Sequence, residues 1–322
     1  MRAWIAAALA FALGMGAALA DTWPSRTVRV VVPFAAGSTP DSVARITADR
    51  LQARLGQPFV IENKPGASGN LGTDAVAKAE PDGYTIGVSI VGPLALNTLL
   101  FPKLPYDPAK DLAPVTILGS QPSVLVVSND LGASSVEELL ARLKRDSARI
   151  NFGSIGLGSL SHLAVEALAA KSGVKLTHIP YPGSPAAVTA LARGDVQLAV
   201  LPAASVVPQG RAGAFAMLAV TSPAVSKLLP DVRTLRSAGV EGVEADAWVG
   251  LVAPARTPEA ILQILRREVA AIMAEPAVRE KLAAQFMEPV ANSPDEFRAV
   301  IRAELERWGP IIAANNIKVG GP

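Results

Sequence analysis

The sequence predicts an α/β fold made of two lobes, and three observations support this class. Apolar runs typical of strands alternate with segments of helical periodicity, the alternation starts again near residue 121, and the chain ends in helical patterns only. Strands that alternate with helices predict a parallel sheet covered by helices. At roughly 150 residues per domain, a chain of 322 residues is long enough for two domains.

The first series of elements begins with the run TVRVVV, a predicted strand over 27–32. A predicted helix follows, with Asp41 as its expected N-cap and Gly56 at its C′ position. The series continues with a strand over 59–61, a helix over 73–79 and a strand over 84–90.

The second series repeats this order. Ser135 and Glu138 have the spacing of a capping box, which stabilises a helix N-terminus by reciprocal hydrogen bonds. Strands are predicted over 123–127, 150–152, 175–179, 196–201 and 215–220, and helices over 135–145, 161–171 and 185–194.

The last part of the chain is predicted to contain helices alone. Thr257 is the expected cap of one helix, and Ser293 with Glu296 forms a capping box for another that ends near residue 314. A block without strands of its own packs most economically on the first domain. We therefore predict a discontinuous domain I over 21–120 and 253–322, with domain II over 121–252 inserted in it. The two crossing segments would form a hinge, with a ligand cleft between the lobes.

Residues 1–20 have the pattern of a secretory signal peptide. Met1 and Arg2 provide a short positive start, residues 3–16 are apolar, and Ala18-Leu19-Ala20 is a small-x-small cleavage site. A membrane anchor is the alternative, but the apolar run is short, contains glycine and ends at a processing site. We expect cleavage after Ala20 and a periplasmic mature protein.

Composition excludes several classes of function. With 30 Lys and Arg against 28 Asp and Glu, the formal net charge of +2 is too small for a generic nucleic-acid binder. The absence of cysteine excludes disulfides and Cys-bound metals, and two histidines disfavour a His-rich metal site. We therefore expect no cofactor, no metal and no nucleic-acid partner.

Two loops rich in small residues stand where a ligand is expected. The first, over 33–41, joins the first strand to its helix at the carboxyl end of a parallel strand. The second, over 153–162, has the same placement and contains three glycines and three serines. Small residues let the backbone approach a ligand, and a helix N-terminus attracts an anion. A plain connection is the alternative for the first loop, and the second lacks the spacing of a dinucleotide or P-loop motif.

Catalysis is not supported by any complete motif. The Gly-x-Ser-x-Gly pattern of a hydrolase fails because Phe152 stands two residues before Ser154. His162 could meet Ser154 or Ser159, yet no third orienting acid is evident, and His178 lies in a predicted strand where a structural role is favoured. We expect a protein that is not an enzyme, with an exported serine hydrolase as the remote alternative.

Several blocks of the chain resemble one known family. The runs TWPSRTVRVVVPFAAGSTPDSVAR, ENKPGASGN, PDGYT, NFGSIGLGSLSHLAVEAL and WVGLVAPARTP are similar to the Bug family, the extracytoplasmic solute-binding receptors of tripartite tricarboxylate transporters. The resemblance implies a two-lobed type II periplasmic-binding-protein fold that traps a small carboxylate. It also implies delivery of that ligand to the membrane permease subunits of such a transporter.

The resemblance further implies that both loops grip a carboxylate through backbone N–H groups and ordered waters, because neither loop core contains Arg or Lys. Carried onto this sequence, the ligand-binding candidates are Phe34, Ala36, Gly37, Ser38, Thr39, Asp41 and Ser89 in the first lobe. In the second lobe they are Ser154, Gly156, Gly158, Ser159, His162, Tyr181 and Gly183.

Two positions depart from the family pattern. Ser38 stands where relatives commonly have a second glycine, which adds a hydroxyl to the first loop. Leu201 stands where many relatives carry an Asp that suits an ammonium group, so a ligand without a free amine is favoured. We expect a monomeric receptor, and a sensor that presents its ligand to a membrane kinase is the alternative within binding proteins.

Overall fold

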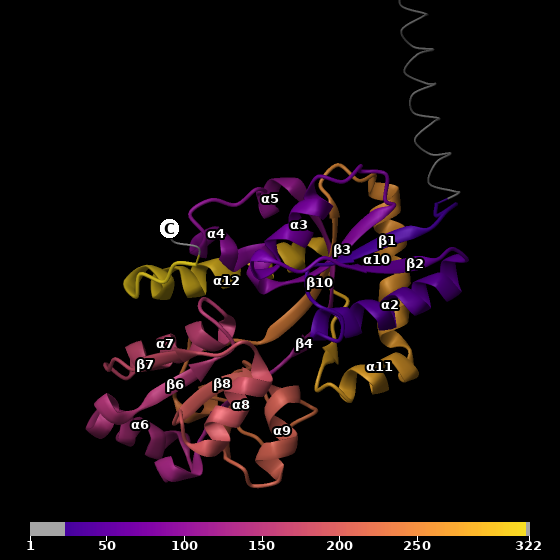
Figure 1. The fold of residues 1–322 in the computed structure, drawn as a ribbon. Helices are drawn as coiled ribbons and strands as arrows, with labels where there is room; N and C mark the ends of the chain where they lie inside the picture. Colours follow the sequence, from indigo (N-terminus) through magenta and orange to yellow (C-terminus); the bar gives the residue numbers. More distant parts are fainter. Residues whose placement is uncertain (1–22, 320–322) are drawn as a thin grey trace, which may run out of the picture.

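The structure, a computed structural model, describes residues 23–319 and has two lobes, each built around a mixed β-sheet (Figure 1). The predicted signal peptide and its cleavage site lie outside the described residues. No helix among residues 23–319 combines the length and the apolar character of a membrane span.

The first lobe contains a six-stranded sheet in the order β11-β4-β10-β3-β1-β2. Its strands are β1 (Val28–Val32), β2 (Phe59–Asn63), β3 (Thr85–Ile90), β4 (Leu112–Gln121), β10 (Ala247–Pro254) and β11 (Glu288–Pro289). Its helices are α2 (Thr39–Leu55), α3 (Asn70–Ala77), the π-helical η2 (Gly92–Leu96), α4 (Asn97–Leu100), α5 (Pro108–Asp111), α10 (Glu259–Ala274), α11 (Pro276–Ala283) and α12 (Pro294–Ala314).

The second lobe contains a five-stranded sheet in the order β7-β6-β8-β5-β9. Its strands are β5 (Ser123–Val127), β6 (Asn151–Ser154), β7 (Thr177–Pro180), β8 (Leu198–Pro202) and β9 (Ala216–Val220). Its helices are α6 (Val136–Asp146), α7 (Leu160–Lys171), α8 (Ser184–Arg193) and α9 (Ala203–Arg211).

Side-chain alternation along the strands builds a core on each face of the first sheet. Val28, Val30 and Val32 of β1 are buried with α2 and α10 on one face, whereas Val31 belongs to the core on the other. Successive side chains of a strand point to opposite faces, so a run of valines supplies both cores.

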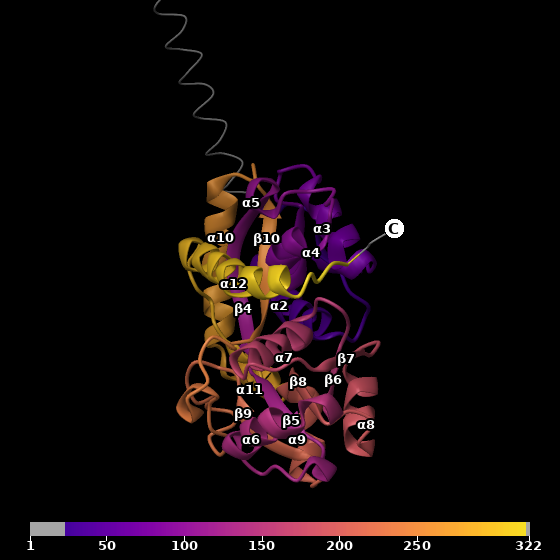
Figure 2. The same cartoon turned by 90° about the vertical axis from the view of Figure 1, so that its left-hand side faces the viewer.

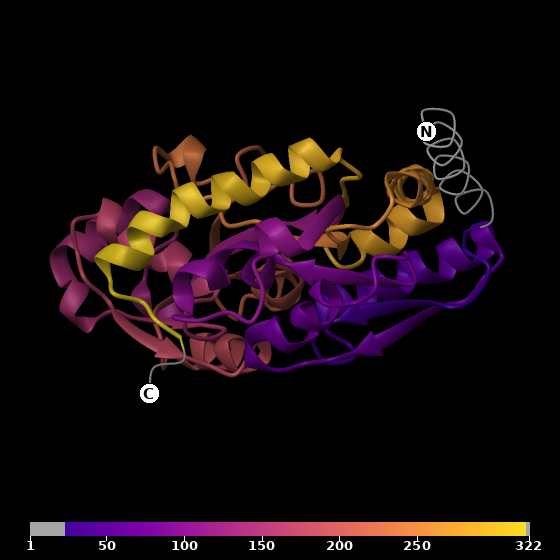
Figure 3. The ribbon, with the colours of Figure 1, turned by 90° about the horizontal axis from the view of Figure 1, so that it is seen from above.

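One hydrophobic core spans both lobes. Leu125 of β5 and Leu163 of α7 share it with Trp308 and Ile312 of α12, a helix whose N-terminal part packs beside β4 of the first lobe. Figure 2 shows α12 lying across the first lobe with α7 of the second lobe below it, and Figure 3 shows the same helix from above. The fold therefore places a shared apolar core at the junction between the lobes.

Three predicted caps are corrected or only partly confirmed. The helix expected to begin at Asp41 begins at Thr39 with Ser38 as N-cap. The helix after Thr257 has Pro258 in the cap position, and the Thr257 hydroxyl is buried without a partner. At Ser135 the hydroxyl accepts from the Glu138 N–H, but the Glu138 carboxylate bonds to Ser134, so only half of that capping box forms. The capping box of Ser293 and Glu296 is complete.

The prediction of helices alone beyond residue 220 was wrong. Strand β10 runs antiparallel between β3 and β4, and β11 adds a short edge. The first sheet is therefore mixed and not purely parallel. The second sheet is mixed as well, because β5 runs antiparallel to β8 and β9. Residues 248–254 are all buried, so β10 lacks the alternation that reveals a half-exposed strand.

The predicted division of the chain at 120/121 and 252/253 stays a prediction. Strand β10 pairs with the first sheet from Ala247 onward, so the return to the first lobe precedes residue 253.

Candidate ligand-binding cleft

A cavity of about 410 Å³ lies between the lobes. This volume is at the small end of the range of roughly 300–1,000 Å³ that is typical of small-molecule sites. None of its lining side chains belongs to Lys, Arg, His, Asp or Glu among the described residues. The wall consists of Phe34, Ser38, Thr39, Pro40, Ile90, Val91, Gly92, Leu96, Gln121, Ser123, Ile155, Gly158, Ser159, Leu160, Ser161, Gly183, Ser184, Pro202, Ala247, Trp248 and Val249.

Three helices begin at the wall of this cavity. Their N-cap residues are Ser38 for α2, Ser159 for α7 and Gly183 for α8, and all three line the cleft. The N–H groups of a first helical turn have no partner within the helix, and the helix dipole makes that end positive. The cleft is thus electrostatically suited to an anion although it contains no cationic side chain.

The first cleft loop, residues 33–41, keeps one hydroxyl free. The Ser38 Oγ atom is buried without a hydrogen-bond partner, and it makes no capping bond to its own helix. Because an unpartnered buried polar group is costly, and because Ser38 lines the cleft, this hydroxyl is available to a bound ligand.

Asp41 stabilises the first cleft loop by hydrogen bonds and does not line the cleft. Its carboxylate accepts from the Gly37 N–H at 2.8 Å, from Arg45 Nε at 3.0 Å and from Asn63 Nδ2 at 2.8 Å. Burial alone would raise the pKa of Asp41, but the hydrogen bonds from Arg45, Gly37 and Asn63 hold that pKa below its ordinary value. The charge of Asp41 is therefore satisfied within the lobe.

The second cleft loop, residues 153–162, is closed by hydrogen bonds to its own atoms. Ser159 Oγ donates to the Gly156 carbonyl at 2.7 Å and accepts from the His162 N–H at 3.3 Å. The Gly158 N–H donates to His162 Nδ1 at 3.1 Å. Gly158 has a φ of +74°, and a Cβ added there would lie 2.8 Å from the Leu100 side chain, so only glycine fits this position without strain.

A stack of rings supports the second cleft loop. The ring of His162 lies 3.8 Å from that of His178, which in turn stacks on Phe152 at 4.8 Å. Burial, together with the neighbouring His162 ring, lowers the pKa of His178 to about 4. His178 is therefore neutral near pH 7, and its Nε2 lies 2.6 Å from Ser154 Oγ.

The structure corrects the serine and histidine pairing of the hydrolase alternative. Ser154 is fully buried and pairs with His178, not with His162. The Ser159 hydroxyl donates to Gly156, while His162 accepts from Gly158 and faces Glu166 at 3.5 Å. Neither serine has an imidazole base and an open approach to the cleft, which nucleophilic catalysis requires.

The predicted site residues fall into two groups. Those on the cleft wall are Phe34, Ser38, Thr39, Gly158, Ser159 and Gly183. Those outside the wall are Ala36, Gly37, Asp41, Ser89, Ser154, Gly156, His162 and Tyr181, of which Ala36 and Gly37 are exposed. Ser89, for example, is buried and lies 3.5 Å from the Thr73 hydroxyl. The buried members of the second group, Asp41, Ser89, Ser154 and His162, support the loops or neighbouring elements and do not line the cavity.

Sequence analysis missed much of the apolar wall. Ile90, Val91 and Gly92 line the cleft immediately after Ser89, and the end of β3 was a signal that could have identified them. Trp248 belongs to the missed strand β10, whose apolar run was the available signal. Leu201 is buried in the second-lobe core, while its neighbour Pro202 lines the cleft. Leu201 therefore does not contact the cleft, and no contact of this residue supports the expectation of a ligand without an amine.

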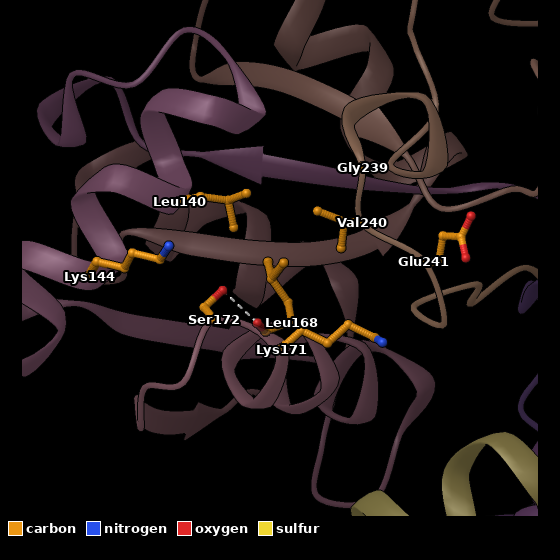
Figure 4. A pocket seen from close by; sticks show the side chains of 8 residues that line it. All are labelled: Leu140, Lys144, Leu168, Lys171, Ser172, Gly239, Val240 and Glu241. Carbon is orange, nitrogen blue, oxygen red and sulfur yellow. Dashed lines mark hydrogen bonds between the residues drawn. The ribbon is translucent and has the colours of Figure 1, made fainter.

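A second cavity, of about 400 Å³, lies within the second lobe (Figure 4). Lys144 of α6 and Lys171 of α7 flank it, and Glu241 stands on a facing loop. Its one lining hydroxyl, that of Ser172, donates to the Leu168 carbonyl at 2.8 Å. No helix begins at this cavity, so we assign the ligand to the cleft between the lobes.

Comparison with known proteins agrees with this geometry. Residues 43–317 match the model of the tripartite tricarboxylate transporter family receptor. The chain is 36% identical over 301 residues to the protein BugT of Bordetella pertussis, covering 93% of this chain and 92% of BugT.

Solved structures of similar proteins have the same fold. The R. palustris protein Rpa4515, solved with adipate, has a TM-score of 0.81 at 35% identity, covering 92% of this chain and 99% of that protein. MatC of Rhodopseudomonas palustris, solved with bound malate, has a TM-score of 0.76 at 33% identity, covering 90% and 100%. The chain therefore belongs to the tripartite tricarboxylate transporter receptor family, whose members are substrate-binding receptors and not enzymes.

Proposed function

We propose that the protein is a periplasmic receptor that captures a small organic carboxylate in the cleft between its lobes. It then delivers the ligand to the membrane permease subunits of a tripartite tricarboxylate transporter. The family supports the transport role, and the adipate and malate in the two R. palustris proteins support the ligand class.

The observation that carries the proposal is the convergence of three helix N-termini on a cleft without charged side chains. A carboxylate oxygen placed at Ser38 and at the first turns of α2 and α7 would meet N–H groups that lack intrahelical partners. Lobes joined at a hinge can close over such a ligand, so binding is expected to make the molecule more compact.

A panel of mono-, di- and tricarboxylates tests this function by thermal shift and small-angle scattering. We expect at least one acid to raise the melting temperature and to reduce the radius of gyration, while its methyl ester or amide does neither. Lys144→Ala, on an exposed face of α6 away from the cleft, is the control and is expected to bind like the wild type. A panel without any shift or compaction would contradict the proposal.

Transport and sensing are separated by a second experiment. Deletion of the gene is expected to abolish uptake of the bound acid by cells that carry the permease subunits, and the expressed receptor is expected to restore it. Unchanged uptake together with loss of ligand-induced transcription would instead favour the sensor.

A further inference from the structure

We infer that the ligand carries a single carboxylate on an uncharged apolar body. This inference rests on the proposed function, because it assigns the ligand class of the same cleft. Three observations support it: the chemistry of the wall, the engagement of its polar side chains, and the position of its free hydroxyl.

The greater part of the wall away from the helix N-termini is apolar. Ile90 and Leu96 come from the first lobe, Ile155 from the second, and Trp248 from β10 at the junction. Apolar side chains from both lobes would pack against the body of a ligand, and each methylene removed from water contributes about 0.8 kcal/mol.

Trp248 lines the cleft, and the polar atom of its side chain is engaged elsewhere. Its Nε1 donates to Glu304 Oε1 at 3.2 Å, and Glu304 belongs to α12 outside the cleft wall. The Trp248 ring also packs edge-on against Phe297, with 5.3 Å between ring centroids. These contacts hold the indole in place, so Trp248 offers no free hydrogen-bond donor to the cavity.

Most polar side chains of the wall are already engaged with backbone carbonyls. Ser123 Oγ donates to Ala245 at 2.8 Å, and Ser159 Oγ donates to Gly156 at 2.7 Å. Ser161 and Gln121 bond in the same way to Val200 and Gln285, respectively. The remaining polar residues of the wall, Thr39 and Ser184, stand in the first turns of α2 and α8. The buried hydroxyl without a partner is Ser38, and it stands at a helix N-terminus.

A second carboxylate that extends away from the helix N-termini would therefore lie among apolar side chains. No cationic side chain of the described residues lines the cleft to neutralise it, and burial of an unpaired charge is strongly unfavourable. An ammonium group meets the same difficulty, because no carboxylate lines the wall. A ligand with one acid group at the helix N-termini and a hydrocarbon body elsewhere matches both the polar and the apolar part of the wall.

Calorimetric titration with matched acids tests the inference. Hexanoate and adipate have the same chain length and differ by one carboxylate, as do cyclohexanecarboxylate and trans-1,4-cyclohexanedicarboxylate; citrate represents tricarboxylates. We expect each monoacid to bind about tenfold or more tightly than its diacid, since an uncompensated charge costs more than the 1.4 kcal/mol that tenfold represents.

The outcomes separate this inference from the proposed function. A diacid or citrate that binds as tightly as the monoacids would overturn the single-charge inference while leaving the carboxylate receptor intact. Failure of every acid to bind would overturn the proposed function, and the inference with it.

A pair of variants sharpens the test. Ile155→Lys places a cation on the cleft wall, and Leu157→Lys places one two residues away on a side chain that is 47% exposed and does not line the cleft. Ile155→Lys is expected to tighten adipate relative to hexanoate about tenfold, in line with a close charge pair of limited solvent exposure. Leu157→Lys is expected to leave the ratio unchanged. An equal shift in both variants would show that the wall at Ile155 does not face the ligand body.

Discussion

The two cleft loops have the same position in the fold but differ in how their polar groups are satisfied. In the second cleft loop the hydroxyls of Ser154, Ser159 and Ser161 all form hydrogen bonds, and His162 fixes the Gly158 N–H. In the first cleft loop the Ser38 hydroxyl has no partner. The second loop is thus a preformed wall, whereas the first leaves a donor for the ligand.

This difference predicts which property a substitution in each loop will change. A change in the second cleft loop removes bonds that exist without ligand, so it affects stability and affinity together. A change at Ser38 removes a bond that forms only with ligand, so it affects affinity alone.

The largest effect is expected from Gly158→Ala. The added Cβ would approach the Leu100 side chain within 2.8 Å at a φ of +74°, so either that side chain or the loop must shift. Gly173→Ala is the matched control because Gly173 has a φ of +68° and open space around the added atom. Both variants bear the strain of about 1–2 kcal/mol that a side chain has at positive φ. Only Gly158→Ala is expected to weaken carboxylate binding. The expected loss is about tenfold or more, because overpacking costs about 1–3 kcal/mol. Equal affinities of the two variants by calorimetry would contradict the proposed wall.

Substitutions of His162 are expected to have the next largest effect. His162→Phe keeps a ring on His178 but leaves the Gly158 N–H without an acceptor, at a cost of about 1–3 kcal/mol in the free energy of unfolding. His162→Asn keeps an acceptor near the position of Nδ1 and is expected to recover much of that loss, both in urea unfolding and in ligand affinity. A positioning role would be refuted if the two variants were equally impaired.

Acidification is expected to act on the second cleft loop before the first. The pKa of His178 falls from 6.5 to about 4 on burial, so the folded state favours the neutral ring. The stability that this provides is present above pH 6.5 and is lost as the pH falls from 6.5 through 4. The pKa of Asp41 is held below its ordinary 3.8, so its contribution persists until the pH falls below that value.

Urea unfolding at pH 7 and pH 4.5 measures this difference. We expect His178→Gln, which can still form a hydrogen bond with Ser154, to lose about 1–2 kcal/mol less on acidification than the wild type. An identical pH dependence of the two proteins would show that His178 does not titrate as its burial requires.

The smallest expected effects distinguish the two N-cap serines. Ser159→Ala removes a cap and a bond to Gly156, so it is expected to cost about 1 kcal/mol of stability. Ser38→Ala is expected to leave the unfolding free energy within about 0.5 kcal/mol of the wild type. It is expected to weaken ligand binding about two- to tenfold, as for one hydrogen bond of about 0.5–1.5 kcal/mol. A Ser38→Ala variant with unchanged affinity would remove this hydroxyl from the site.

The sequence identified the loops more accurately than the rest of the cleft. A strand followed by small residues and a helix start is a local pattern, and the residues Ser38, Thr39, Gly158 and Ser159 that it singled out line the cavity. The wall at Trp248 depends on β10, which is inserted between strands far away in the chain. Its residues are buried throughout, so neither alternation nor helical period reveals it.

Polar partners were the other feature that the sequence could not provide. His162 and Ser159 are a local pair, within four residues of each other. Ser154, in contrast, forms its hydrogen bond with His178 of the neighbouring strand β7. Similarly, Asp41 was predicted to cap its helix, but a buried network with Arg45 and Asn63 engages its carboxylate. Tertiary neighbours decide such pairings, and sequence spacing does not fix them.

The central claim is that the cleft holds a carboxylic acid, and the most direct test is mass spectrometry of the ligand that copurifies with the protein from periplasm. The wild type is expected to release a small acid with one carboxyl group, and Gly158→Ala purified in parallel is expected to release little or none. A released ligand without a carboxyl group, or one retained equally by Gly158→Ala, would contradict the account.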